Sequence, residues 1–348
     1  MSTITTEVPV VELSSYRAGV RGARDSVAAA LGEALRTVGF VSFVGHGVDW
    51  SLIEEIYDWA ARYHGLAAEA KADHLLSGTT MGYNPIGGES HADGRPSSLN
   101  AAFFMARPGS SRNLWPREEV LPGFRQACER YYLAMDRFCH GWLLPLYAVA
   151  FGMEPTYFQE RFDPSLATLR LSHYPPLPAA EGQWGIDPHT DAGFMTLLPS
   201  NPVDGLWIKP DVPAGPGWFA VRQEPQSFVV NAGDMLRRWT NDRSLSTVHR
   251  ALNQSPVDRY AIPFFYDPRV DSMVQCLPSC TDVNDPPHYE PVRYGDYLRA
   301  FMRRNYAPVR GESRAGRPGG SVQLRAQGRP LVPIVAEDKR GPRGLHGP

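Results

Sequence analysis

Residues 185–193 read Gly-Ile-Asp-Pro-His-Thr-Asp-Ala-Gly and contain a His-x-Asp pair, His189 and Asp191. The next five residues are Phe-Met-Thr-Leu-Leu, so the aspartate stands beside apolar side chains. An ionised carboxylate in such surroundings costs on the order of several kcal/mol unless a cation or a protonated group pairs with it. Because residues i and i+2 of a strand point to the same face, His189 and Asp191 would aim an imidazole and a carboxylate at one point.

A third candidate ligand is His249, in the segment Ser-Thr-Val-His-Arg at 246–250. Two neutral imidazoles and one carboxylate form the ligand set that suits non-heme Fe(II) and leaves coordination positions open. A His-x-Asp pair by itself is a weak signal, because a strand histidine bonded to a nearby aspartate is common. The interpretation as a metal site therefore depends on the rest of the chain.

Composition narrows the class of protein. The chain has 348 residues and a formal net charge of −2, which gives no electrostatic support for a nucleic-acid or anionic-membrane partner. No apolar run approaches the ~20 residues of a membrane-spanning helix, and the first residues lack the basic start and apolar core of a secretory signal. The four cysteines fit neither a zinc cage nor a disulfide framework, so we expect a cytoplasmic protein.

The two halves of the chain carry different patterns. In the first half, helical spacing predicts helices at 26–38, 50–64 and 123–152, with short strands at 8–13, 40–44 and 99–105 and a long loop at 77–100. In the second half, strand-length segments recur about every ten residues, as in a sandwich or barrel. These segments lie at 169–174, 193–198, 205–208, 218–221, 227–230, 235–239, 247–252 and 260–266, and a helix is predicted at 289–306.

These patterns divide the chain into three expected regions. Residues 1–165 form a mostly helical region, and residues 166–306 form a strand-rich core that ends in a helix. Residues 307–348 are rich in Arg, Gly and Pro and poor in aromatic residues, which predicts a disordered tail.

Further motifs surround the candidate ligands. His249 follows Asp191 after 57 intervening residues, and Arg259 comes ten residues after His249. The supporting motifs are Val-Pro-Val-Val-Glu-Leu at 8–13, Gly-Phe-Val at 39–41, Gly-His-Gly-Val at 45–48, Tyr-Pro at 174–175 and Val-Asn-Ala-Gly-Asp at 230–234. In this order and at these spacings, the motifs resemble the isopenicillin N synthase-like group of Fe(II)/2-oxoglutarate-dependent oxygenases over roughly residues 8–306.

The resemblance implies a fold and a chemistry. The fold would be α+β with a mainly β core, a double-stranded β-helix (jelly roll) flanked by helices that come largely from the N-terminal half. His189, Asp191 and His249 would bind Fe(II), 2-oxoglutarate would be the co-substrate, and O2 and a small-molecule substrate would be the other reactants. The reaction would be a hydroxylation, desaturation or cyclisation that releases succinate and CO2.

The co-substrate site departs from the family pattern at one residue. The resemblance implies that Arg259 binds the far carboxylate of 2-oxoglutarate, for which a planar guanidinium is well suited. The family usually has Arg-x-Ser, whereas this chain has Ala261 in the place of the serine. Tyr174 is our candidate for the missing hydroxyl. His173 is a further histidine on the same segment, and we expect it to face away from Tyr174.

Three alternatives stay open at this point. A member of the same family that uses Fe(II) and O2 without 2-oxoglutarate is compatible with Ala261. A catalytically silent jelly-roll binding protein is disfavoured by the intact ligand set. A nucleic-acid- or protein-modifying role is disfavoured by the near-neutral charge. The oligomeric state is left open.

Substrate contacts are predicted from the resemblance alone. The family builds its pocket near residues 82–85 and 100–104 and from the C-terminal helix, so we select Tyr83 and Arg303 as candidates. If Arg303 points inward, it would favour an acidic substrate. The loop that carries Glu89, His91 and Arg95 is a candidate lid.

Overall fold

The computed structural model describes residues 7–78, 80–88, 98–180, 183–211 and 217–305. The expected disordered tail at 307–348 and the candidate lid residues Glu89, His91 and Arg95 lie outside these ranges. The described helical segments are α1 (Ser14–Arg17), α2 (Ala23–Thr37), α3 (Trp50–His64), α4 (Ala68–Ala72), α5 (Phe124–Phe138), a π-helical turn (Cys139–Leu143), α6 (Leu144–Ala150), α7 (Asp234–Trp239), α8 (Tyr294–Asn305) and 3-10 turns at Gln159–Phe162 and Pro278–Cys280.

The strands form three sheets among the described residues. They are β1 (Val10–Glu12), β2 (Phe40–Val44), β3 (Tyr83–Asn84), β4 (Ala101–Ala106), β5 (Leu166–Tyr174), β6 (Ile186–His189), β7 (Met195–Pro199), β8 (Leu206–Lys209), β9 (Phe219–Ala220), β10 (Phe228–Ala232), β11 (Val248–Ala251), β12 (Arg259–Ala261), β13 (Phe264–Asp267), β14 (Met273–Val274) and β15 (Val292–Arg293). The large sheet has the order β1-β2-β10-β7-β13-β5-β4-β3, with β12 also paired to β5. The small sheet has the order β6-β11-β8-β9, and β14 pairs with β15.

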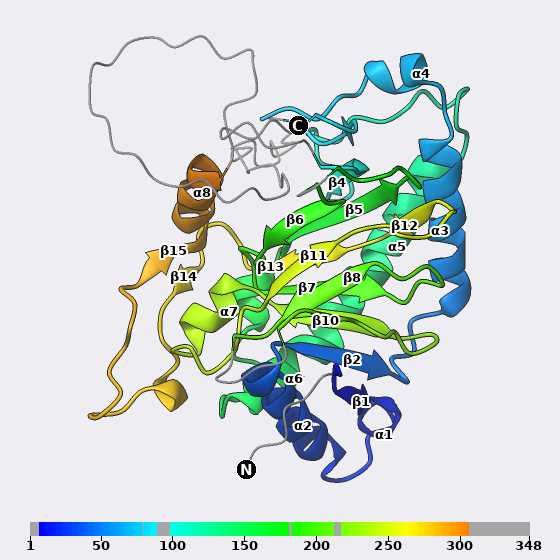
Figure 1. Ribbon diagram of the computed structural model, residues 1–348. Coiled ribbons are helices and arrows are strands. Elements are labelled where there is room, and N and C mark those ends of the chain that lie inside the picture. Colours follow the sequence, from blue (N-terminus) through cyan, green and yellow to red (C-terminus); the bar gives the residue numbers. More distant parts are fainter. Residues whose placement is uncertain (1–6, 79, 89–97, 181–182, 212–216, 306–348) are drawn as a thin grey trace, which may run out of the picture.

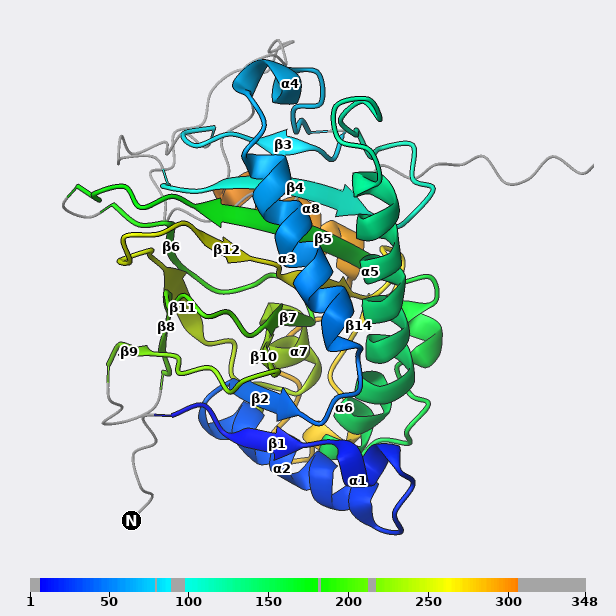
Figure 2. The ribbon, with the colours of Figure 1, turned by 90° about the vertical axis from the view of Figure 1, so that its right-hand side faces the viewer.

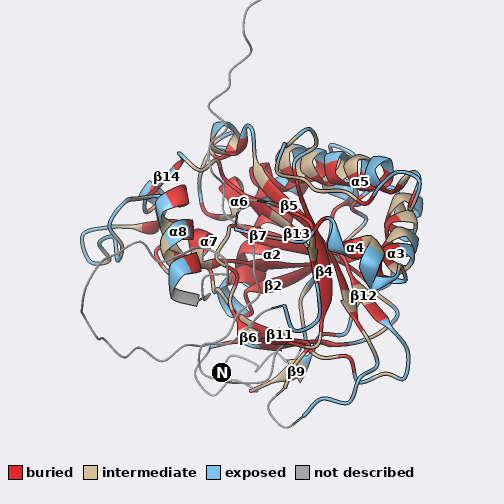
Figure 3. Cartoon of the chain, turned by 90° about the horizontal axis from the view of Figure 1, so that it is seen from above, coloured by how far each residue is buried: buried red, intermediate tan, exposed pale blue. Residues whose placement is uncertain are grey.

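The layers explain where a site can form. Helices α3, α5 and α6 cover one face of the large sheet, and the small sheet lies on the other side (Figures 2 and 3). The main hydrophobic cluster fills the space between these helices and the large sheet. The facing surfaces of the two sheets contribute only small apolar clusters. The space between the sheets is therefore free for polar side chains.

The fold is a mixed α+β fold whose strand core comes from the C-terminal half (Figure 1). The N-terminal half supplies most of the covering helices, as expected, but it also extends the large sheet at both edges. There β2 pairs with β10 and β4 pairs with β5. The division at residue 165 stays a prediction. None of the described helices combines the length and the apolar character that crossing a bilayer requires.

One predicted strand is wrong. Residues 235–239 form most of helix α7 rather than a strand. Met235, Leu236 and Trp239 are buried, while Arg237 and Arg238 are not. Spacings of one and four residues put the three apolar side chains on one helical face, whereas a strand would place Met235 and Leu236 on opposite faces. A run of five residues was too short for its periodicity to be decisive.

Candidate metal centre

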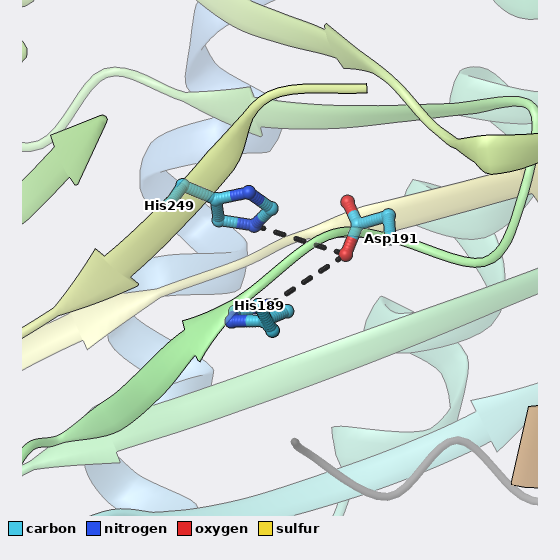
Figure 4. A group of neighbouring side chains, drawn as sticks. All are labelled: His189, Asp191 and His249. Atoms are coloured by element: carbon cyan, nitrogen blue, oxygen red, sulfur yellow. Dashed lines mark ion pairs between the residues drawn. The ribbon is translucent and has the colours of Figure 1, made fainter. Parts of the chain in front are cut away.

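The two histidines lie side by side on the small sheet. His189 ends β6, and His249 lies in the neighbouring antiparallel strand β11 as its direct register partner. The centroids of the two imidazole rings are 4.2 Å apart. Asp191 follows two residues after His189, just beyond the end of β6, and turns its carboxylate toward both rings (Figure 4). The predicted triad is thus brought together by one strand pair and the turn that follows it.

The three ligand atoms converge without bonding to one another. Asp191 Oδ1 is 3.7 Å from His189 Nε2 and 3.8 Å from His249 Nε2, and one possible ligand atom from each residue lies within 4.8 Å of the others. Both carboxylate–imidazole separations are too long for hydrogen bonds. All three side chains are buried. Two imidazole nitrogens and one carboxylate oxygen therefore surround a point where one ion can be held.

The second nitrogen of each imidazole fixes its orientation. His189 Nδ1 is 2.7 Å from the carbonyl oxygen of Asp187, and His249 Nδ1 is 3.1 Å from that of Thr247. A carbonyl oxygen only accepts hydrogen bonds, so each Nδ1 must carry the proton. The lone pair of each Nε2 is then available to a metal, which is the usual arrangement behind a metal-bound histidine.

The large sheet holds the other carboxylate oxygen of Asp191. Thr196 on β7 donates its Oγ1–H to Oδ2 at 2.6 Å, and Asn231 on β10 donates from Nδ2 to the same oxygen at 2.8 Å. Thr196 and Asn231 are direct register partners on these neighbouring strands. The two bonds leave Oδ1 turned toward the histidines.

These contacts account for the buried charge of Asp191. Burial alone would raise the pKa of this carboxyl group, but His249, His189 and the two hydrogen bonds outweigh burial and hold the pKa below its usual value. Asn231 belongs to the Val-Asn-Ala-Gly-Asp motif, but its contact with Asp191 was not predicted, and neither was that of Thr196. Thr196 is a polar residue between Met195 and Leu197 in the β7 segment, and side chains alternate between the two faces of a strand. This pattern could have indicated that Thr196 faces the opposite side from its apolar neighbours.

The triad lines a cavity of about 600 Å³, including its open mouth, between the two sheets. The lining is mostly apolar, and it also contains Arg170, Tyr174, Arg250, Arg259 and Ala261. A largely apolar cleft with a few polar groups at defined positions is typical of a small-molecule site.

Arg259 reaches this cavity as a buried cation with spare donors. The residue is only 1% exposed and its Nε donates to the carbonyl oxygen of Val203 at 3.1 Å. Its guanidinium lies 4.8 Å from the centre of the Tyr174 ring, and its Nη1 has no hydrogen-bond partner among the described residues. Arg259 and Tyr174 are register partners on β12 and β5, so the structure places both predicted co-substrate residues at one end of the cavity.

The other sequence candidates lie elsewhere. Tyr83 on β3 is half-buried and packs against the rings of Tyr63 and His64, and it does not line the cavity. Arg303 on α8 is exposed and does not line it either. His173 faces away from Tyr174, as expected. Its ring stacks on Tyr260 and its Nε2 lies 2.6 Å from Asp258 Oδ1.

Comparisons with known proteins point in one direction. Residues 165–268 match the family described as the 2OG-Fe(II) oxygenase superfamily, and residues 8–119 match the family described as the non-haem dioxygenase in morphine synthesis N-terminal. The chain is 34% identical over 297 residues to the 2-oxoglutarate-dependent dioxygenase citB of Monascus ruber, which covers 78% of this chain and 87% of that protein. It is 29% identical over 322 residues to the 2-oxoglutarate-Fe(II) type oxidoreductase hxnY of Emericella nidulans, covering 86% and 91%.

Solved structures give the same result. A full-length Neurospora crassa protein in complex with alpha-KG superposes with a TM-score of 0.79 at 25% identity, covering 87% of this chain and 98% of that one. JOX2 in complex with 2OG, Fe and JA superposes with a TM-score of 0.72 at 26% identity, covering 86% and 85%. The resemblance inferred from the motifs is confirmed.

Proposed function

We propose that this chain, which belongs to the 2OG-Fe(II) oxygenase superfamily and is an Fe(II)- and 2-oxoglutarate-dependent oxygenase, acts on an organic small molecule. The proposed outcome is a hydroxylation, a desaturation or a ring closure. The observation that carries the proposal is the convergence of His189 Nε2, His249 Nε2 and Asp191 Oδ1 beside a mostly apolar cavity. We further propose that the two facing sheets are the double-stranded β-helix (jelly roll) of this family, and that the protein acts in the cytoplasm, where its free cysteines would stay reduced.

The donor set fits Fe(II). Two neutral imidazoles and one carboxylate on one face are the ligands that non-heme Fe(II) oxygenases use, and they leave positions for a co-substrate and O2. Bound iron, with 2-oxoglutarate and O2, supplies the oxidising chemistry, and succinate and CO2 are released. Asp187 and Thr247 hold the imidazoles through their carbonyl oxygens, and the large sheet holds the carboxylate.

The remaining roles belong to the cavity. We assign the far carboxylate of 2-oxoglutarate to Arg259. Its Nη1 has no hydrogen-bond partner in the described part of the chain, and its planar guanidinium suits a bidentate contact. Tyr174 lies beneath that guanidinium and would orient it. The apolar walls would exclude water from the reacting atoms. The net charge of −2 supports a small molecule over a nucleic acid as the substrate.

Tyr83 and Arg303 have less support as substrate contacts than the residues of the cavity wall, because neither lines the cavity. An oxidase that dispenses with 2-oxoglutarate and a silent binding protein are no longer favoured. The intact triad and the co-substrate named for the relatives both support the oxygenase.

The test is an anaerobic titration of Fe(II)-loaded protein with 2-oxoglutarate, followed by the visible charge-transfer band of the iron chelate. We expect a band in the wild type and no band in His249→Ala. Arg259→Lys should bind 2-oxoglutarate at least tenfold more weakly, because lysine keeps the positive charge but lacks the planar guanidinium that binds a carboxylate through two N–H groups. Arg125→Ala is the control, because Arg125 is an exposed residue of α5 paired with Glu129. A wild-type protein that binds iron but gives no band would refute the proposal.

A further inference from the structure

The cavity carries more positive charge than iron and the co-substrate can balance. Its charged lining residues are Arg170, Arg250 and Arg259 against the single carboxylate of Asp191, a surplus of two positive charges. Bound Fe(II) and the 2-oxoglutarate dianion cancel each other and leave this surplus unchanged. Arg250 is enclosed by aromatic rings, with its guanidinium 4.0 Å from the ring centre of Trp184 and 4.1 Å from that of Trp218. Neither Arg250 nor Arg170 forms an ion pair among the described residues, but Arg170 faces one ring, that of Phe104 at 5.1 Å, and is the more deeply buried of the two. Arg170 is therefore the cation that most requires an anionic partner.

Arg170 is held in place without being neutralised. It lies on β5 and is only 1% exposed, and its Nη2 donates to Asn100 Oδ1 at 2.6 Å. Asn100 in turn donates from Nδ2 to the carbonyl oxygen of Gly185 at 2.5 Å, which fixes its amide. Among the described residues, the Nε of Arg170 has no hydrogen-bond partner, and the guanidinium forms no ion pair with a carboxylate. A buried cation in this state is unfavourable unless a ligand supplies the anion.

The co-substrate is badly placed to be that anion. Arg170 precedes Tyr174 by four residues on β5, and Tyr174 is the register partner of Arg259. At roughly 3.3 Å per residue, Arg170 and the Arg259 end of the cavity are about 13 Å apart along the strand. A five-carbon diacid with one carboxylate on iron and the other on Arg259 has no third anionic group for Arg170.

We propose that Arg170, oriented by Asn100, binds a carboxylate group of the substrate, so that the enzyme oxidises an organic acid. The inference rests on the proposed function and adds the substrate class to it. It also moves the recognition of an acid from Arg303, where the sequence suggested it, to a residue of the cavity wall. A guanidinium fixed by one nitrogen still presents further N–H groups to a planar carboxylate.

The test uses the protein loaded with Mn(II) and 2-oxoglutarate, and a set of aliphatic and aromatic carboxylic acids, each beside its own primary amide. Calorimetric binding is measured for the wild type, Arg170→Gln and Arg170→Lys. We expect acids to bind at least tenfold more tightly than their amides to the wild type, this preference to vanish in Arg170→Gln, and part of it to persist in Arg170→Lys. Asn100→Ala, which keeps the cation but removes its support, should weaken the preference several-fold and serves if the arginine variants fail to fold.

The inference is overturned if no acid in the set is preferred over its amide, or if the preference survives in Arg170→Gln. The visible 2-oxoglutarate band of the Fe(II) form separates this outcome from a failure of the proposed function. The band should be unchanged within twofold in Arg170→Gln. A tenfold loss of 2-oxoglutarate affinity there would make Arg170 a co-substrate residue and would also overturn the inference, whereas a missing band in the wild type would refute the oxygenase assignment itself.

Discussion

Thr196→Val tests whether the large sheet controls the metal site on the small one. Valine has nearly the shape of threonine but no hydroxyl, so the substitution removes the bond from Thr196 Oγ1 to Asp191 Oδ2 and little else. Asn231 still holds the same oxygen at 2.8 Å. The carboxylate should therefore stay in the site but become freer to rotate Oδ1 away from the histidines.

The magnitude follows from the hydrogen bond. A bond to an ionised group contributes about 1.5–3 kcal/mol, and each 1.4 kcal/mol corresponds to a factor of about ten in affinity. The metal-free protein loses the same bond, so only the part that orients Oδ1 appears in metal binding. We therefore expect the lower end of the range, a metal affinity about tenfold weaker, in line with the effect of residues that support metal ligands.

The assay is a titration of metal-free protein with Mn(II), in which the free ion is measured by electron paramagnetic resonance. Thr240→Val is the matched control, because Thr240 is buried like Thr196 and donates its Oγ1–H to the carbonyl oxygen of Leu236 at 2.9 Å, but at the end of helix α7. This control should lose stability and keep its metal affinity. The reasoning is refuted if Thr196→Val binds Mn(II) within twofold of the wild type, or if Thr240→Val shows the same loss.

Three further predictions concern co-substrate binding, stability in acid and metal binding. A Cβ atom at Gly205 would lie 2.8 Å from Arg259 Nε, so Gly205→Ala should weaken 2-oxoglutarate binding about tenfold in the chelate titration. A Cβ atom at Gly141 would meet no atom within 4 Å, so Gly141→Ala is the control and should leave 2-oxoglutarate binding unchanged. Equal effects of the two substitutions would contradict the prediction. Burial lowers the pKa of His64 to about 3, so its stabilising contribution is complete above pH 6.5 and is lost as the pH falls toward 3. Because of His64, the free energy of unfolding measured in urea should be about 2 kcal/mol lower at pH 5 than at pH 7. If the same pH dependence of the unfolding free energy remains in His64→Gln, His64 is not its cause. Mn(II) at about 100 times its dissociation constant should stabilise the wild type by about 2.7 kcal/mol, reversibly on chelation, and should leave His249→Ala unaffected.

Several parts of the fold were predictable because their signal is local. The helix predicted at 50–64 has those bounds in the structure, since its apolar residues repeat at helical spacing over four turns. The segment 40–44 forms a strand, as its β-branched and aromatic residues indicated. The five residues at 235–239 were assigned wrongly because so short a segment fits more than one period.

For the site, the sequence by itself determined the chemical types and the short spacings. His189 and Asp191 stand two residues apart, and His249 follows at a spacing typical of the family. These residue types and spacings were sufficient to predict the iron site. The register that sets His249 opposite His189 could not be predicted, because it joins strands 60 residues apart. Only the packing of two sheets decided that Arg170 lines the cavity. The physical reason is that period and composition act along the chain, whereas the neighbours of a side chain are set by strand register and layer packing, which depend on the whole fold at once.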